Sequence, residues 1–132
     1  MRTQLPHLIR IIAGPVQMDA ELNDSPTAQE VWDALPINAS ANTWGDEIYF
    51  AIPVDSPLQD GKAVVSLGNL GYWPPGRAFC IFFGLTPASR GAEIRPASPV
   101  NIIGRVRGDA TAFKQVRAGA AVRLERAEAE AR

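Results

Sequence analysis

Apolar and polar residues alternate near the start of the chain. Residues Val16–Leu22 place an apolar side chain at every second position, and residues 8–13 before them are rich in β-branched side chains. Both patterns are typical of β-strands. Because Gly14 and Pro15 lie between the two segments, the sequence predicts a β-hairpin.

The apolar spacing then changes to three and four residues, which is typical of an amphipathic helix. Val31 and Leu35 lie on one apolar stripe. Ser25 can accept hydrogen bonds from the free N–H groups of the first turn, and Pro26 suits the first helical position. The pattern predicts a short helix that begins at Pro26 and ends before Pro36.

A polar stretch of small residues at 38–42 is expected to form a loop, and residues 43–53 after it to form a strand. Alternation gives this strand one apolar face: Ile48, Phe50 and Ile52. The opposite face carries Glu47 and Tyr49, together with Ala51, so the two faces are expected to have different roles.

Four further apolar segments predict strands: residues 63–67, 78–83, 100–103 and 121–125. The last strand is expected to turn Val122 and Leu124 inward. A second short helix is expected before it, because Asp109 suits an N-cap and Gly119 suits a helix end. Seven or eight strands with two short helices indicate a closed or nearly closed β-barrel.

Residues 68–84 hold four glycines and two prolines around the single strand predicted at 78–83. Glycine and proline usually interrupt strands. Tyr72 and Trp73 come directly before Pro74 and Pro75, and the two prolines restrict the backbone. We therefore expect a rigid loop that leads into the strand.

The charge balance excludes some classes of partner. Thirteen basic and 14 acidic residues give a net charge of −1, so no general attraction to nucleic acid is expected. No run approaches about 18 apolar residues, so no membrane-spanning helix is expected. A chain of 132 residues is long enough for one domain with its own core.

Cysteine and histidine are both nearly absent. Cys80 is the only cysteine, so no intrachain disulfide can form, which suits a reducing cytoplasm. His7 is the only histidine, which excludes a histidine-rich metal site. The N-terminal residues lack the features of a signal peptide. We expect a cytoplasmic protein without a metal or a cofactor.

Four blocks rich in aromatic residues, glycine and proline are similar to those of a known family: residues 42–50, 71–76, 82–87 and 96–104. The chain resembles a small, uncharacterised prokaryotic branch of the cyclophilin-like proteins over residues 5–126. The resemblance implies a mainly β fold, a closed eight-stranded antiparallel barrel with two short helices capping its ends. We expect a single domain over residues 1–132, with a frayed tail at 127–132.

The classical cyclophilins, which the chain also resembles more distantly, are peptidyl-prolyl isomerases. In those enzymes an arginine donates a hydrogen bond to the twisting amide, and a histidine precedes the strand that leads to the second helix. The pairing of motifs puts the arginine position at Phe50, or at Tyr49 if the register moves by one residue. The histidine position falls near Val100 or Asn101. Residues 44–56 contain neither arginine nor histidine, so the usual donor is missing there.

Eight aromatic or polar residues are candidates for the lining of a groove that binds a peptide or a small molecule: Trp44, Glu47, Tyr49, Tyr72, Trp73, Thr86, Ser98 and Asn101. Aromatic side chains would supply contact area, and the polar groups would orient the ligand. The structural alternative is that Trp44 and Trp73 close the barrel and that Glu47 is solvated or paired with a cation.

Three functions remain open from the sequence. The first is a binding module for an extended peptide or a small molecule. The second is a prolyl isomerase with a different hydrogen-bond donor. The third is another enzyme that uses Glu47 and Tyr49 as an acid–base pair, which requires Glu47 to lie in a cleft with a raised pKa.

Overall fold

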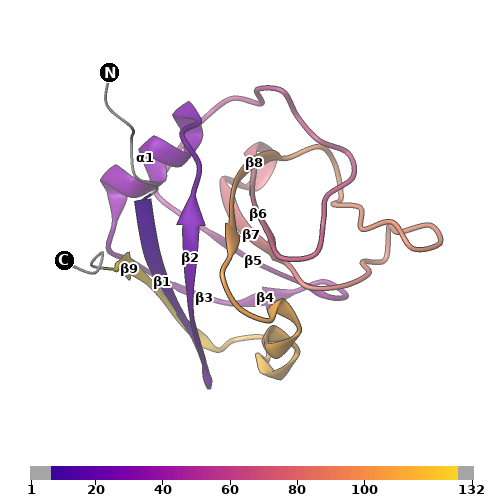
Figure 1. The fold of residues 1–132 in the computed structure, drawn as a ribbon. Helices are drawn as coiled ribbons and strands as arrows, with labels where there is room; N and C mark the ends of the chain where they lie inside the picture. The colour runs from indigo at the N-terminus through magenta and orange to yellow at the C-terminus, as the bar shows by residue number, and fades with distance from the viewer. Residues whose placement is uncertain (1–6, 128–132) are drawn as a thin grey trace.

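A computed structural model describes residues 7–127, and over this range one antiparallel sheet holds nine strands (Figure 1). In chain order the strands are β1 (His7–Ala13), β2 (Val16–Leu22), β3 (Ile37–Ser40), β4 (Asn42–Thr43), β5 (Glu47–Ala51), β6 (Asn69–Trp73), β7 (Ala78–Phe82), β8 (Asn101–Val106) and β9 (Ala121–Arg126). Their order across the sheet is β3-β9-β1-β2-β8-β6-β7-β5-β4. The sheet curls into the barrel that the sequence predicted.

One extended segment closes this barrel. β3 and β4, at the two ends of the strand order, are separated only by Ala41. The first half of the segment pairs with β9, and the second half pairs with β5. The N–H of Ala41 donates to the carbonyl of Ala120 at 2.9 Å, which continues the pairing with β9 beyond Ser40. Counted as one strand, the segment reduces the nine strands to the expected eight.

The loop predicted at residues 38–42 is therefore wrong. Small polar residues have low strand propensity, but pairing with neighbouring strands outweighs this preference when backbone partners are available. Ile37 and Ala41 are both buried, and the segment finds hydrogen-bond partners on β9 and β5. Tertiary pairing decides the structure here.

The barrel interior is a continuous apolar cluster, and the predicted parity of β5 is confirmed within it. Ile48, Phe50 and Ile52 point inward, and Phe50 stacks on Phe79 with ring centroids 5.3 Å apart. Val122 and Leu124 of β9 also point inward, as predicted. This cluster holds the barrel together through the burial of apolar surface.

Two short helices lie at opposite ends of the barrel (Figure 1). The first, α1 (Pro26–Ala34), has the predicted cap, because the N–H of Ala28 donates to Oγ of Ser25 at 3.2 Å. The second is a 3₁₀ helix, η2 (Ala110–Gln115), capped by Asp109 as predicted. Its Phe113 is fully buried against the core.

The segment 68–84 differs from its prediction, because it forms two strands. β6 and β7 make a hairpin joined by the 3₁₀ turn η1 (Pro74–Gly76). Gly71 lies inside β6, where a Cβ would come within 3.1 Å of Cγ2 of Val100. The glycine thus permits close packing inside a strand, although its presence argued against one.

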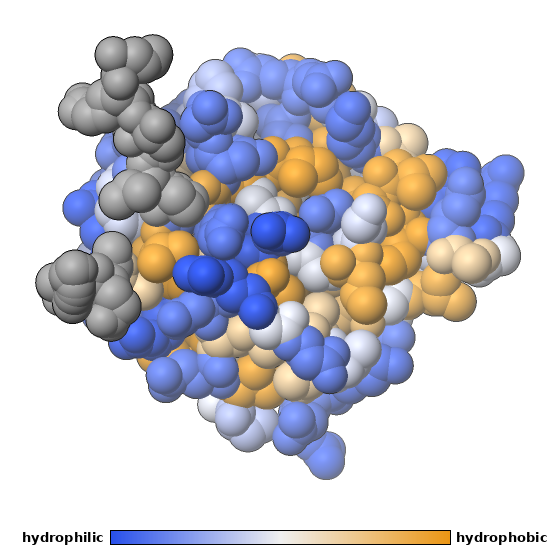
Figure 2. Space-filling view, viewed as in Figure 1, coloured by the Kyte–Doolittle hydropathy of each residue, from blue (hydrophilic) through white to orange (hydrophobic). Residues whose placement is uncertain are grey.

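Long connections cover the outer face of β5, β7 and β6. They bury a second apolar cluster outside the barrel: Val65, Ala78, Cys80, Phe82, Ile94 and Val100. The strand predicted at residues 63–67 is wrong, because Val65 makes only a single bridge to Ile94. Figure 2 shows apolar surface gathered on this side of the molecule. Four large apolar side chains of the connections are exposed: Leu58, Val64, Leu67 and Leu85.

The described residues end at Ala127, which is buried and whose N–H donates to the carbonyl of Leu8 at 2.9 Å. Ala127 is therefore fixed, although it was expected to belong to the frayed tail. The rest of that predicted tail, 128–132, lies outside the described residues. In the part of the chain that the structure describes, no helix has the length and apolar character needed to cross a bilayer.

Candidate functional site

A tight hairpin between β4 and β5 brings the first site residues together. Trp44 and Glu47 exchange two backbone hydrogen bonds, 2.9 and 3.2 Å long, across the Gly45-Asp46 turn. Gly45 has a φ of +60°, as the first central residue of a type II′ turn requires. Residues paired in this way project to the same face. Tyr49 follows Glu47 by two positions and shares that face.

The neighbouring strands supply the floor and one wall of the site. Cys80 of β7 is paired with Tyr49 and is fully buried. Trp73 lies at the end of β6, where its Nε1 donates to Oγ of Ser98 at 2.6 Å. A Cβ at Gly76 would come within 2.8 Å of Cζ3 of Trp73, so only glycine fits against the ring. Trp73 is thereby held in one orientation.

The connection between β7 and β8 forms the roof. Oγ of Ser89 accepts hydrogen bonds from the N–H groups of Thr86 and Arg95, at 3.0 and 3.2 Å. The hydroxyl of Thr86 donates to the carbonyl of Arg95. These bonds cross-link the two arms of the loop. They fix the approach of Pro96 and Ala97, the next residues, to the site.

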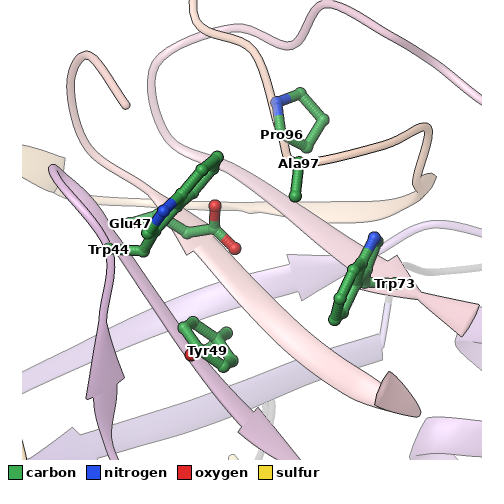
Figure 3. Close-up of a pocket in the computed structure, with 6 residues that line it drawn as sticks. All are labelled: Trp44, Glu47, Tyr49, Trp73, Pro96 and Ala97. Carbon is green, nitrogen blue, oxygen red and sulfur yellow. The ribbon is translucent and has the colours of Figure 1, made fainter. Parts of the chain in front are cut away.

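These elements enclose a pocket of about 220 Å³ on the outside of the barrel, lined by Trp44, Glu47, Tyr49, Trp73, Pro96 and Ala97. Figure 3 shows the carboxyl group of Glu47 pointing into the space between Trp44 and Trp73. The three aromatic side chains are only partly buried, so their rings are available to a ligand.

Glu47 is the unusual group of the pocket. Only 5% of it is exposed, and Oε1 is the one buried side-chain oxygen or nitrogen within residues 7–127 that has no hydrogen-bond partner. Burial disfavours the charged form and raises the pKa of Glu47 from 4.5 to about 7, although a hydrogen bond from Cys80 opposes the shift. Both protonation states are therefore populated at neutral pH.

Cys80 adjoins this carboxyl group and is itself shielded from water. Burial raises the pKa of its thiol well above the ordinary value, and the neighbouring Glu47 raises it further. The thiol carries one proton, and the carbonyl of Ala78, 3.8 Å from Sγ, competes with Glu47 for it. The thiol is thus a weak partner for Glu47 and a poor nucleophile.

The comparisons with known proteins agree with this architecture. A family model described as cyclophilin-like matches residues 7–125. The chain belongs to the cyclophilin-like family. It is also similar to a hypothetical protein from Archaeoglobus fulgidus, known from a solution structure, with 42% identity and a TM-score of 0.82. That match covers 96% of this chain and 98% of the other. No curated protein matched.

The two residues that the sequence offered for the position of the usual arginine lie on opposite faces of β5. Tyr49 points outward into the pocket, whereas Phe50 lies in the barrel core. Of the two candidate positions, only Tyr49 therefore lies on the pocket side. None of the six described lining residues is a lysine, an arginine or a histidine. Arg77, which follows the η1 turn, instead approaches Asp55 at 3.5 Å.

Four of the eight predicted site residues line the pocket: Trp44, Glu47, Tyr49 and Trp73. Ser98 accepts the hydrogen bond from the Trp73 indole, and Thr86 donates a hydrogen bond within the roof loop. Neither of these two lines the pocket.

Tyr72 and Asn101 lie elsewhere and anchor the connection before β6. The hydroxyl of Tyr72 donates to the carbonyl of Val54 at 2.6 Å and accepts from the N–H of Ser56 at 3.1 Å. Oδ1 of Asn101 accepts from the N–H of Gln59 at 2.7 Å. These contacts account for both side chains structurally.

The sequence interpretation missed Pro96, Ala97 and the Gly45-Asp46 turn. Reading residues 43–53 as one strand hid the fact that Trp44 and Glu47 face each other across a hairpin. The signal was present, because a Gly-Asp pair between strand-like residues is typical of a two-residue hairpin turn. No local pattern identified Pro96 and Ala97, since a distant hydrogen-bond network positions them.

Proposed function

We propose that the pocket binds an extended peptide or a small molecule by enclosing one apolar group. The observation that carries this proposal is the pocket itself, in which Trp44, Tyr49 and Trp73 present partly buried rings around about 220 Å³. Such a volume suits a single side chain or a small ligand group. Aromatic lining with one convergent polar group is typical of ligand sites.

The rigidity of the walls supports the same proposal. Trp73 is fixed by Ser98 and Gly76, and Trp44 lies beside a tight turn. The roof is cross-linked through Thr86 and Ser89. A preformed pocket loses little conformational entropy when a ligand enters, so modest contacts are sufficient for affinity.

Titration of a ¹⁵N-labelled sample with a set of apolar fragments and short peptides tests this proposal. We expect shifts of the Trp44 and Trp73 indole signals, and we expect Trp73→Ala to weaken binding about tenfold or more. Trp32→Ala is the matched control, because Trp32 is also partly buried but stacks on His7 and lies outside the pocket. Equal losses in the two variants, or no shift with any probe, would contradict the proposal.

A second candidate is prolyl isomerisation with Glu47 as the hydrogen-bond donor. The observation in its favour is the buried carboxyl group, whose raised pKa keeps a proton available near neutral pH. The acid–base pair of Glu47 and Tyr49 depends on the same group. A carboxyl proton directed at the twisting amide would stabilise the transition state electrostatically.

A protease-coupled assay on Ala-Pro and Leu-Pro peptides separates this candidate from simple binding. We expect acceleration that falls as the pH rises through about 7, as Glu47 loses its proton. Glu47→Gln retains a neutral donor, so its rate should not depend on pH in this range. No acceleration at micromolar protein would remove the candidate.

A further inference from the structure

The unpaired oxygen of Glu47 indicates what kind of ligand fits the pocket. Oε1 has no partner within the described residues, and Glu47 is only 5% exposed. A buried carboxyl oxygen without a partner is costly, and a ligand that supplies a donor or a positive charge lowers that cost. The group points into the pocket rather than toward another strand (Figure 3).

The other lining residues narrow the choice further. Pro96 and Ala97 offer only apolar side-chain contacts, and the six lining residues include no cation that could bind an anionic ligand. Trp44, Tyr49 and Trp73 each have an electron-rich ring face, which attracts a cation. A buried carboxylate among aromatic faces therefore favours a ligand that is both positively charged and apolar.

We propose that the pocket binds an alkylammonium group, with the Glu47 carboxylate as its counter-ion and Trp44, Tyr49 and Trp73 as its aromatic walls. This inference rests on the proposed binding function and deepens it. A methylated ammonium combines a diffuse positive charge with an apolar surface, so it satisfies both parts of the lining. Such a group occurs in free quaternary amines and in methylated lysine side chains.

Proton release accompanies binding in this arrangement, because the cation stabilises the charged form of Glu47. From β7 the Cys80 thiol faces the carboxyl group, and from β5 the Tyr49 phenol shares its face. Charged groups on the elements packed around Glu47 are paired with each other: Asp46 of the turn lies 3.5 Å from Lys114 of η2. In the roof loop, Arg95 pairs with Glu93 at 2.9 Å. Affinity should therefore follow the ionisation of Glu47.

Choline and its neutral carbon isostere, 3,3-dimethylbutan-1-ol, test the inference. At pH 8 we expect choline to bind about tenfold or more tightly than the isostere, and we expect the ratio to fall at pH 5.5. In a second version of the experiment, the affinity of a short peptide with trimethyllysine is compared with that of the same peptide carrying its neutral tert-butyl analogue. Preference for the ammonium in either version supports the inference, and the ammonium that binds more tightly identifies the source.

Glu47→Gln should abolish the preference for the ammonium while the isostere still binds. Incorporation of fluorinated tryptophans is a second measurement that leaves the fold intact. It weakens the negative ring face, so it should lower the affinity for choline stepwise and leave that of the isostere unchanged.

Two failures are distinguishable. Equal affinity for choline and the isostere, or fragment binding without any choline binding, would overturn the alkylammonium inference and leave the proposed pocket function in place. No indole shift with any fragment, peptide or ammonium would overturn both.

Discussion

Tyr72 and Glu47 are two buried polar side chains on neighbouring parts of the same sheet, and their surroundings differ completely. Tyr72 faces the barrel interior with no exposed surface, and its hydroxyl both donates and accepts a hydrogen bond. Glu47 faces the outer layer, is nearly as buried, and leaves Oε1 without a partner among residues 7–127. Burial alone therefore does not determine whether a polar group has a hydrogen-bond partner.

The two groups differ in whether their hydrogen bonds are made within the described part of the chain. The interior uses the Tyr72 hydroxyl to fix the connection at Val54 and Ser56, which stabilises the fold. In the pocket, Oε1 of the Glu47 carboxyl group lacks a hydrogen bond, and such a buried oxygen is costly unless a ligand supplies one. Four predictions test this contrast, beginning with the largest effect.

Removing an aromatic ring from the interior should have the largest effect on stability. Phe79→Ala deletes a fully buried ring that stacks on Phe50, so it should lower the free energy of unfolding by about 3–5 kcal/mol. Tyr49→Ala, on the pocket side, should lose less than half as much, because Tyr49 is only partly buried. Urea unfolding of both variants measures the difference, and equal losses would contradict the distinction between the two layers.

The ionisation of Glu47 should make stability depend on pH. Its pKa is higher in the folded chain, so between about pH 4.5 and 7 the folded state binds more protons than the unfolded state. The free energy of unfolding therefore includes a contribution from Glu47 that is fully present below about pH 4.5 and is lost as the pH rises through about 7. This loss of stability amounts to about 3 kcal/mol in total.

Comparison of the wild type with Glu47→Gln isolates this contribution from the other carboxyl groups. Relative to the wild type, the variant should gain stability as the pH is raised from 5 to 8, as measured by denaturant unfolding at each pH. A difference between the two proteins that stays constant with pH would show that Glu47 ionises normally.

Tyr72→Phe should cost about 1–3 kcal/mol, because it leaves the buried N–H of Ser56 and the carbonyl of Val54 without their partner. The loss should be the same at pH 5 and pH 8, in contrast to Glu47. Hydrogen exchange at Ser56 is a local measurement of the same effect. Unchanged protection there would argue against an anchoring role.

The smallest effect is expected for the Tyr49 hydroxyl. Tyr49→Phe retains the ring and should change the free energy of unfolding by no more than about 0.5 kcal/mol. Its ligand affinity should also persist, since the ring face provides the contact. A large loss of stability would assign the hydroxyl a structural bond that the described contacts do not include.

The parts of the fold set by local patterns could be predicted. The alternation of Ile48, Phe50 and Ile52, the cap at Ser25 and the inward direction of Val122 and Leu124 all follow from side-chain periodicity or local hydrogen bonding. The segment around Ala41 and strand β6 could not, because small polar residues and glycines pair there only through distant strands.

The candidate site divides in the same way. Glu47 and Tyr49 could be placed together because residues two apart on a strand share a face. The joining of Trp73 to that face, and the roof at Pro96, depend on strand order and on the bonds among Thr86, Ser89 and Arg95. Tyr72, although next to Trp73 in sequence, points to the opposite side of the sheet.

The segment that contains β3 and β4 also determines how much of the sheet edge is left unpaired. An unpaired sheet edge is a template for strands of other chains. Here both ends of the strand order fall on one short segment, and each half is already hydrogen-bonded to β9 or β5. The barrel therefore presents no long edge for intermolecular pairing within residues 7–127. A substitution at Ala41 that disrupts this segment would therefore expose backbone groups of β9 and β5 at the same time.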